Sequence, residues 1–144
     1  MGWGNLVALQ GGNMGLKQGL ENLVETARLA APPVRIALMG DGSQRAALEQ
    51  LGAGVPALQL LPPAEAADFP AVLAAADVLL VNERASAVDA SLPSKLTSYV
   101  SAGVPVLAAV PLGGRTASEV AWSGGGVLVP PENRGAVLVG DMRV

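Results

Sequence analysis

The chain of 144 residues contains no cysteine and no histidine. Without cysteine it can form neither a disulfide nor a thiolate metal site. Without histidine, Ser-His-Asp hydrolysis and histidine-ligated zinc catalysis are excluded as well. Any chemistry must therefore use carboxylates, lysine, arginine, hydroxyls, backbone amides or the ligand itself.

Basic residues are scarce too. Nine lysines and arginines stand against twelve aspartates and glutamates, which gives a formal net charge of −3 and an isoelectric point of about 4.8. Because no run of basic residues occurs, nucleic acid is not an expected partner.

Long apolar runs are absent, although hydrophobic residues make up 51% of the chain and the mean hydropathy is +0.43. The most apolar stretch, 71–81, is interrupted by Asp77 and is too short to span a bilayer. The N-terminal residues lack the basic start and apolar core of a signal peptide. We expect a soluble, cytoplasmic protein without a transmembrane segment.

Aromatic residues make up only 3% of the chain, and alanine, valine and leucine dominate, a balance that suits helices packed on a parallel sheet. Apolar strand-like runs alternate with helical patterns, which predicts one α/β domain with a Rossmann-like three-layer α/β/α architecture and a parallel sheet of about six strands. The predicted strands are 5–10, 34–39, 56–61, 78–81, 104–108 and 127–129, and the predicted helices are 16–27, 43–51, a short one from 69, 93–103 and one from 116. In the helix 43–51, Leu48 and Leu51 are expected to face inward, and the continuous apolar run of 78–81 is typical of a strand buried on both faces.

The longest patterned stretch runs from Leu92 to Val106. Pro93 fits the first turn of a helix, Ser94 can cap its free amides, and Gly103 can end it. Lys95 would then lie at a partly positive helix end, where a phosphate binds well. The alternative is a capped surface helix with a solvated lysine.

Three polar or glycine-rich loops should meet at the carboxyl edge of the sheet, where open parallel sheets bind ligands. They are 11–15, 40–42 and 82–94, and Lys17 follows the first as Lys95 follows the third. Two lysines and two helix N-termini at one edge would hold a diphosphate. As alternatives, the first loop could be only a tight turn, and Asp41 in the second could only cap the next helix.

Two common nucleotide motifs do not fit these loops. Gly40 and Gly42 lack the third glycine of the dinucleotide fingerprint, because Arg45 stands there, and Asp41 is the only candidate for an acidic ribose ligand. Lys17 is neither preceded by glycine nor followed by serine or threonine, so it does not belong to a Walker A motif.

Five blocks in order are together more specific than any one of them. They are 12–21 (GNMGLKQGLE), 39–45 (MGDGSQR), 74–78 (AAADV), 92–106 (LPSKLTSYVSAGVPV) and 124–131 (GGGVLVPP). This ordered set, from about Leu6 to about Glu132, resembles the C-terminal donor-binding domain of group 1, GT-B-type glycosyltransferases, of the bacterial colanic-acid or exopolysaccharide kind. The resemblance implies transfer of a hexosyl group, with retention at the anomeric carbon, from a GDP- or UDP-linked sugar, without a cofactor or an essential metal.

Carried over by position, the resemblance assigns three residues to the reaction. Lys17 would contact the donor diphosphate, Lys95 would face the phosphates or the sugar, and Asp89 lies near the place of a family glutamate that touches the sugar. The remaining donor-binding positions are Gly12, Asn13, Gly15, Gly40, Leu61, Pro93, Ser94 and Ser98.

Two of these positions depart from the family pattern. Asn13 stands near the place of an arginine that usually accompanies the first-loop lysine, and Ser98 stands in place of the glutamate that holds the ribose. We hypothesise that Lys95 replaces the charge of the missing arginine.

The resemblance also predicts the domain organisation. Residues 1–132 would form the donor domain and 133–144 a truncated or atypical tail, while the acceptor would be held by an N-terminal domain or a subunit outside this sequence. The chain would then be inactive alone, and the full enzyme could associate peripherally with a membrane. The alternative is a non-catalytic nucleotide-sugar-binding module or a subunit of a split transferase.

Overall fold

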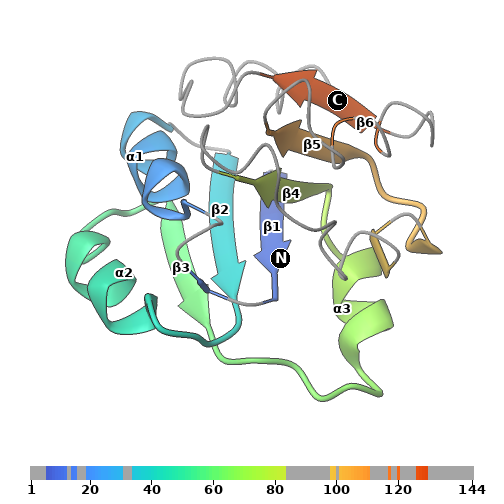
Figure 1. The fold of residues 1–144 in the computed structure, drawn as a ribbon, viewed down its shortest axis with the longest axis horizontal. Helices are drawn as coiled ribbons and strands as arrows, with labels where there is room; N and C mark the ends of the chain where they lie inside the picture. Colours follow the sequence, from blue (N-terminus) through green and yellow to red (C-terminus); the bar gives the residue numbers. More distant parts are fainter. Residues whose placement is uncertain are drawn as a thin grey trace.

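The computed structural model of the chain describes residues 6–12, 14–15, 19–30, 34–83, 98–99, 101–110, 117, 120 and 126–129. Within these residues, six parallel strands form one sheet in the order β3-β2-β1-β4-β5-β6 (Figure 1). The elements are β1 (Leu6–Gly11), α1 (Glu21–Leu29), β2 (Val34–Met39), α2 (Arg45–Leu51), β3 (Leu58–Leu61), α3 (Phe69–Ala74), β4 (Val78–Asn82), β5 (Val106–Ala109) and β6 (Gly126–Val129). The predicted α/β class and parallel sheet are confirmed.

The strand order reverses direction between β1 and β4. From β1 the chain builds outward to β2 and β3, and it then returns to place β4 on the other side of β1. This is the switch point of a doubly wound sheet, and ligands of such sheets bind outside the carboxyl ends of the strands there. The arrowheads of β1, β2 and β3 in Figure 1 mark that edge.

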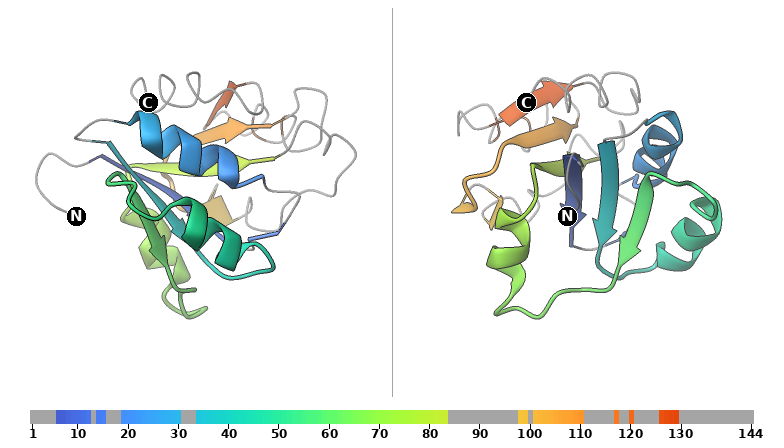
Figure 2. Two further views of the ribbon diagram at one scale, coloured as in Figure 1. Left: turned by 90° about the vertical axis from the view of Figure 1, so that its left-hand side faces the viewer. Right: turned by 180° about the vertical axis from the view of Figure 1, so that it is seen from behind.

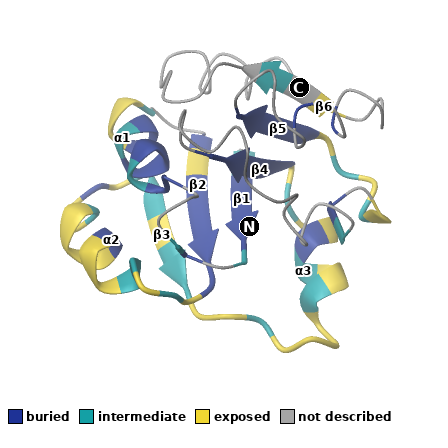
Figure 3. Cartoon of the chain, in the orientation of Figure 1, coloured by how far each residue is buried: buried dark blue, intermediate teal, exposed yellow. Residues whose placement is uncertain are grey.

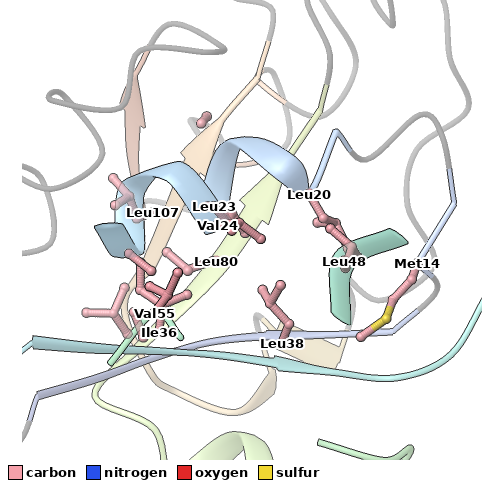
Figure 4. Close-up of a cluster of buried hydrophobic side chains, with 14 residues drawn as sticks. Met14, Leu20, Leu23, Val24, Ile36, Leu38, Leu48, Val55, Leu80 and Leu107 are labelled. Atoms are coloured by element: carbon pink, nitrogen blue, oxygen red, sulfur yellow. The ribbon is translucent and has the colours of Figure 1, made fainter. Parts of the chain in front are cut away.

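Two apolar clusters, one on each face of the sheet, hold the layers together. On one face α1 and α2 pack on the strands, with Leu23 and Leu48 buried against Leu38 and Leu80 (Figure 4). On the other face α3 packs through Leu73. Two further views show α1 and α2 on one side and α3 on the other (Figure 2). The three-layer prediction is confirmed.

β4 lies in the middle of the sheet and is buried along its whole length (Figure 3). Its side chains alternate between the two clusters, so Leu80 faces α1 while Leu79 and Val81 face the opposite layer. A strand covered on both faces needs apolar residues at every position, which explains its unbroken apolar sequence.

Several predicted boundaries differ from the structure. Helix α1 begins at Glu21 rather than near residue 16, because Gly19 has φ +56° and Leu20 is the N-cap. Helix α2 begins at Arg45, and Leu51, expected to face inward, is 38% exposed. Strands β3 and β5 each begin two residues later than predicted, at Leu58 and Val106.

The predicted boundary near 132 and the tail 133–144 lie outside the described residues. Among the helices that are described, none has both the length and the apolar character needed to cross a bilayer.

Candidate functional site

The loops that follow β1 and β2 are joined by backbone hydrogen bonds at the carboxyl edge. The first edge loop is defined here by its described residues Gly12, Met14 and Gly15, and the second edge loop by residues 40–44. The Gly12 N–H donates to the Met39 carbonyl at 2.9 Å, and the Met14 N–H donates to the Asp41 carbonyl at 2.9 Å. The Gln44 N–H returns a bond to the Met14 carbonyl, also at 2.9 Å. The two loops therefore form one connected unit.

Gly40 is required by the closeness of these loops. Its φ is +147°, and a Cβ on it would lie 1.9 Å from the Gly12 carbonyl oxygen. No side chain fits there, so the position has a structural reason to be glycine. Its predicted role beside a bound donor stays a prediction.

Arg45 connects the second edge loop to β3. Its Nη1 donates to the carbonyls of Gly40 and Leu61, the latter at 3.0 Å. The Gly40 N–H also donates to the Leu61 carbonyl, at 3.2 Å. These bonds of Arg45 were not predicted, because no local sequence pattern indicates a side chain that bonds to carbonyls on two separate segments.

Tyr99 makes the corresponding connection on the other side of β1. Its hydroxyl accepts the Gly11 N–H at 2.9 Å and lies 3.0 Å from the Leu80 carbonyl, to which it can donate its proton. Paired positions of β1 and β4 are Ala8–Val78 and Leu9–Leu79, so the hydroxyl joins the two strands just beyond their paired residues.

The Tyr99 side chain is fully buried, and burial raises the pKa of its phenol, although the hydrogen bond from Gly11 opposes that shift. The phenol therefore keeps its proton at neutral pH and can donate to a carbonyl. Tyr99 packs in the second cluster through its ring. Its hydroxyl bonds were not foreseen.

Two polar residues end β4 at the same edge. The Asn82 Nδ2 donates to the Gly19 carbonyl at 2.9 Å, which ties β4 to the residue just before α1. The Glu83 N–H donates to the Ala109 carbonyl at 3.0 Å, and the residue is buried. Glu83 therefore lies at the carboxyl edge of the sheet, one residue beyond β4.

Gln10 is the polar residue of β1 that lies nearest this edge. It is fully buried, and neither its Oε1 nor its Nε2 has a hydrogen-bond partner in the structure as described. Buried amides without partners are costly, so they are rare in folded proteins. Alternation along the strand places Gln10 on the α1 face, as it does Asn82 on β4.

Similarity to known proteins identifies the fold. No protein-family model matches the chain. The chain is 40% identical over 100 residues to the putative colanic acid biosynthesis glycosyl transferase WcaI of Escherichia coli K12, an alignment that covers 67% of this chain and 25% of that protein. Among solved structures, the Anabaena protein HepE in complex with UDP-glucose aligns over 96% of this chain, with a TM-score of 0.78 and 21% identity.

This chain has the fold of the C-terminal domain of a GT-B glycosyltransferase. The lipopolysaccharide glycosyltransferase WaaG aligns with it over 96% of the chain, at a TM-score of 0.73 and 17% identity. The chain spans a quarter of the length of WcaI, and it covers 38% of HepE and 37% of WaaG. The similarity therefore concerns one GT-B domain rather than a whole transferase.

The described part of this GT-B domain includes five of the predicted donor-binding residues. Gly12 and Gly40 lie against each other, and the Leu61 carbonyl is bonded to the Gly40 N–H. Ser98 is the helical neighbour of Tyr99, whose hydroxyl reaches Gly11. Gly15 follows Met14 in the first edge loop. The other predicted residues, Asn13, Lys17, Asp89, Pro93, Ser94 and Lys95, lie outside the described residues.

One alternative for this edge is ruled out. Asp41 does not cap α2, because the N-cap is Gln44; the Asp41 Oδ1 instead accepts the Gly42 N–H at 2.8 Å. In the described part of the GT-B domain, no group of three or more acidic residues is placed to hold a metal ion.

Proposed function

We propose that the chain binds a nucleotide diphosphate sugar at the carboxyl edge of its sheet and serves as the donor half of a glycosyltransferase. The observation that carries this proposal is the connected pair of edge loops at the β1–β4 switch point, in a chain 40% identical to a putative colanic acid glycosyl transferase over the aligned residues. The complex of HepE with UDP-glucose supports the choice of ligand class.

In this proposal the protein acts mainly by electrostatic stabilisation. Negative charge grows on the diphosphate as the sugar leaves, and fixed positive groups near it favour the transition state over the ground state. Lys17 and Lys95 supply that charge, and Asp89 contacts the sugar. Lys17 and Lys95 are the chain's only lysines, and each closely follows a loop predicted to reach the same edge.

The edge loops supply the frame for these side chains. Hydrogen bonds join the first edge loop to the second, and Arg45 joins the second to β3. A frame fixed before binding reduces the entropy lost when the donor is held. We propose that Leu61 lies on the side of the nucleotide base and Ser98 near the ribose, as the sequence blocks imply.

The acceptor is proposed to be held by another domain or subunit, because the chain spans only a quarter of the length of WcaI. We further propose that the transferred group is a hexosyl group and that the configuration at its anomeric carbon is retained. The transfer needs no metal or cofactor and takes place in the cytoplasm. A chain that binds the donor but gives no transfer with any acceptor domain would instead be a nucleotide-sugar-binding module.

Calorimetric titration of the chain with UDP, GDP, ADP and NAD tests the donor site. We expect one nucleoside diphosphate to bind in the micromolar range, and the Lys17→Ala and Lys95→Ala variants to weaken it by roughly 1.5–3 kcal/mol each, the scale of a hydrogen bond to a charged group. Arg35→Ala is the matched control, since Arg35 is exposed near the amino end of β2, away from the proposed site. Absence of binding to all four nucleotides would overturn the proposal.

A further inference from the structure

We propose that Tyr99 is a positioning residue that couples its own helical segment to the first edge loop, so that the donor meets both as one prearranged surface. The Tyr99 segment is defined here by the helical residues Ser98, Tyr99 and Ser101. The inference deepens the proposed function and rests on it for the identity of the ligand. The coupling itself rests on two buried hydrogen bonds.

The geometry of the hydroxyl carries the argument. It accepts the Gly11 N–H at 2.9 Å and approaches the Leu80 carbonyl at 3.0 Å, and it also lies 3.4 Å from the Gly11 carbonyl. Its single proton therefore serves the Leu80 carbonyl. One atom thus joins β1, β4 and the Tyr99 segment at the switch point, where the strand order reverses.

This bond fixes the positions of two donor-binding residues relative to each other. Gly11 is followed directly by Gly12 of the first edge loop, and Tyr99 is preceded directly by Ser98, the position that the sequence blocks place near the ribose. A donor that spans both positions, with its phosphates on one side and its ribose on the other, depends on their separation. Displacements of about 1 Å are enough to weaken a site of this kind.

The Tyr99 segment is also anchored on its other side. The Ala102 N–H bonds to the carbonyls of Ser98 at 3.1 Å and Tyr99 at 3.2 Å, and Gly103, with φ +72°, turns the chain toward β5. The segment is therefore held at both ends, by β5 through the chain and by β1 and β4 through the hydroxyl. Among the described residues, the anchors that remain without the hydroxyl are the β5 connection and the packing of the ring.

Packing alone does not explain why this residue is a tyrosine. The ring lies in the second cluster among apolar side chains such as Leu79, Val106 and Val110, where phenylalanine would fill the same volume. The hydroxyl brings a polar atom into this apolar cluster, at a cost unless it is bonded. It is bonded, and its partners are backbone atoms of the two strands at the switch point.

The test compares Tyr99→Phe with Thr26→Val. Both variants remove one buried hydroxyl and keep the volume, but the Thr26 hydroxyl bonds to Asn22 within α1, away from the edge. The readouts are residue-resolved hydrogen exchange and the affinity for UDP and GDP. We expect Tyr99→Phe to speed exchange at Gly11, Met14 and Ala102 while Ile36 and Leu38 keep their protection, and to raise the nucleotide Kd about tenfold, the effect of one lost hydrogen bond.

The outcomes separate the two proposals. Uniformly faster exchange, unchanged exchange, or the same Kd shift in Thr26→Val would overturn the role of Tyr99. If Tyr99→Phe does not fold, equal opening free energies for the Gly11 and Ala102 amides in the unchanged chain support the coupling, and unequal ones overturn it. If the unchanged chain binds none of UDP, GDP and ADP, the proposed function fails, and the exchange data alone decide whether the two segments are coupled.

Discussion

The carbonyl oxygen of Gly12 lies 1.9 Å from the position that a Cβ of Gly40 would occupy. The two residues follow neighbouring strands, β1 and β2, and their contact lets the two edge loops exchange backbone hydrogen bonds. A side chain at Gly40 would force these loops apart. The contact makes the edge sensitive to a change of a single methyl group.

Gly40→Ala should therefore destabilise the domain far more than its backbone angle alone would. We expect a loss of about 3 kcal/mol or more, the sum of a positive-φ penalty of about 1–2 kcal/mol and a comparable overpacking term. Gly54→Ala is the matched control, because Gly54 also has positive φ, at +78°, but in the described structure nothing lies within 4 Å of the position that its Cβ would take. Urea unfolding of both variants measures the difference, and equal losses would contradict the steric explanation.

Arg45→Met should lower the free energy of unfolding by about 1–3 kcal/mol, because it removes the side-chain donor to the Gly40 carbonyl and one of the two donors to the Leu61 carbonyl, which keeps its bond from the Gly40 N–H. The ion pair of Arg45 with Glu49, at 3.4 Å and half-exposed on the glutamate side, should add little. Denaturant titration of Arg45→Met and of Glu49→Gln tests how the stabilisation is divided between the carbonyl bonds and the ion pair. A loss in Glu49→Gln as large as that in Arg45→Met would show that the ion pair, not the carbonyl bonds, matters.

Gln10→Leu should stabilise the domain by about 1–3 kcal/mol, since it removes a buried amide that has no partner in the described structure. Asn82→Leu, on the same face of the sheet, should destabilise it because the Asn82 amide bonds to Gly19. The opposite signs can be read from thermal or denaturant unfolding of the two variants. A loss of stability in Gln10→Leu would mean that the amide is satisfied in solution, for instance by a buried water.

Tyr99 is the only tyrosine of the chain, so its ionisation can be followed directly by ultraviolet absorbance. Burial raises the pKa of the folded phenol above the ordinary value of about 10. The neutral form is therefore favoured by folding; its contribution is complete below pH 10 and is lost as the pH rises further, because the unfolded chain then releases the proton.

We expect no tyrosinate signal from the folded chain near pH 10–11, whereas the chain in urea should titrate near pH 10. Between pH 10 and the pH of alkaline unfolding, stability should fall more steeply in the unchanged chain than in Tyr99→Phe. A folded chain that ionises at the same pH as the urea-unfolded chain would contradict the burial of the hydroxyl.

The core of this fold could be predicted from the sequence because it depends on local patterns. The apolar run of β4 identified a strand covered on both faces, and the alternation of strands with helices identified a parallel sheet. The prediction of which α2 residues face inward was right for one of two leucines: Leu48 is buried, but Leu51 lies in the last turn and is 38% exposed. The start of α1 was missed because apolar residues at helical spacing continue on both sides of Gly19. The positive φ of Gly19 is not helical, but nothing in the sequence pattern indicates it.

The candidate site was less predictable, since its connections are made between segments far apart in the chain. The glycines of the edge loops were found, but their contact with each other was not, because close approach of two backbones leaves no spacing to recognise. Arg45 bonds across 16 residues to Leu61, and Tyr99 bonds across 88 residues to Gly11. Each had an ordinary local explanation, as a helix residue and as a core residue, and only the topology shows what their polar atoms reach.

The hydrogen bonds at the carboxyl edge form an almost continuous line from Leu61 through Gly40, Met39 and Gly12 to Gly11, Tyr99 and Leu80. Nearly every atom in this line belongs to the main chain; within the described part of the chain, the side chains that join it are those of Arg45 and Tyr99. Main-chain atoms are the same for every amino acid except proline, so, Gly40 apart, outward side chains of these loops can be exchanged without removing an atom from the line. Such an edge lets descendants of one sequence change what they recognise while inheriting the same scaffold.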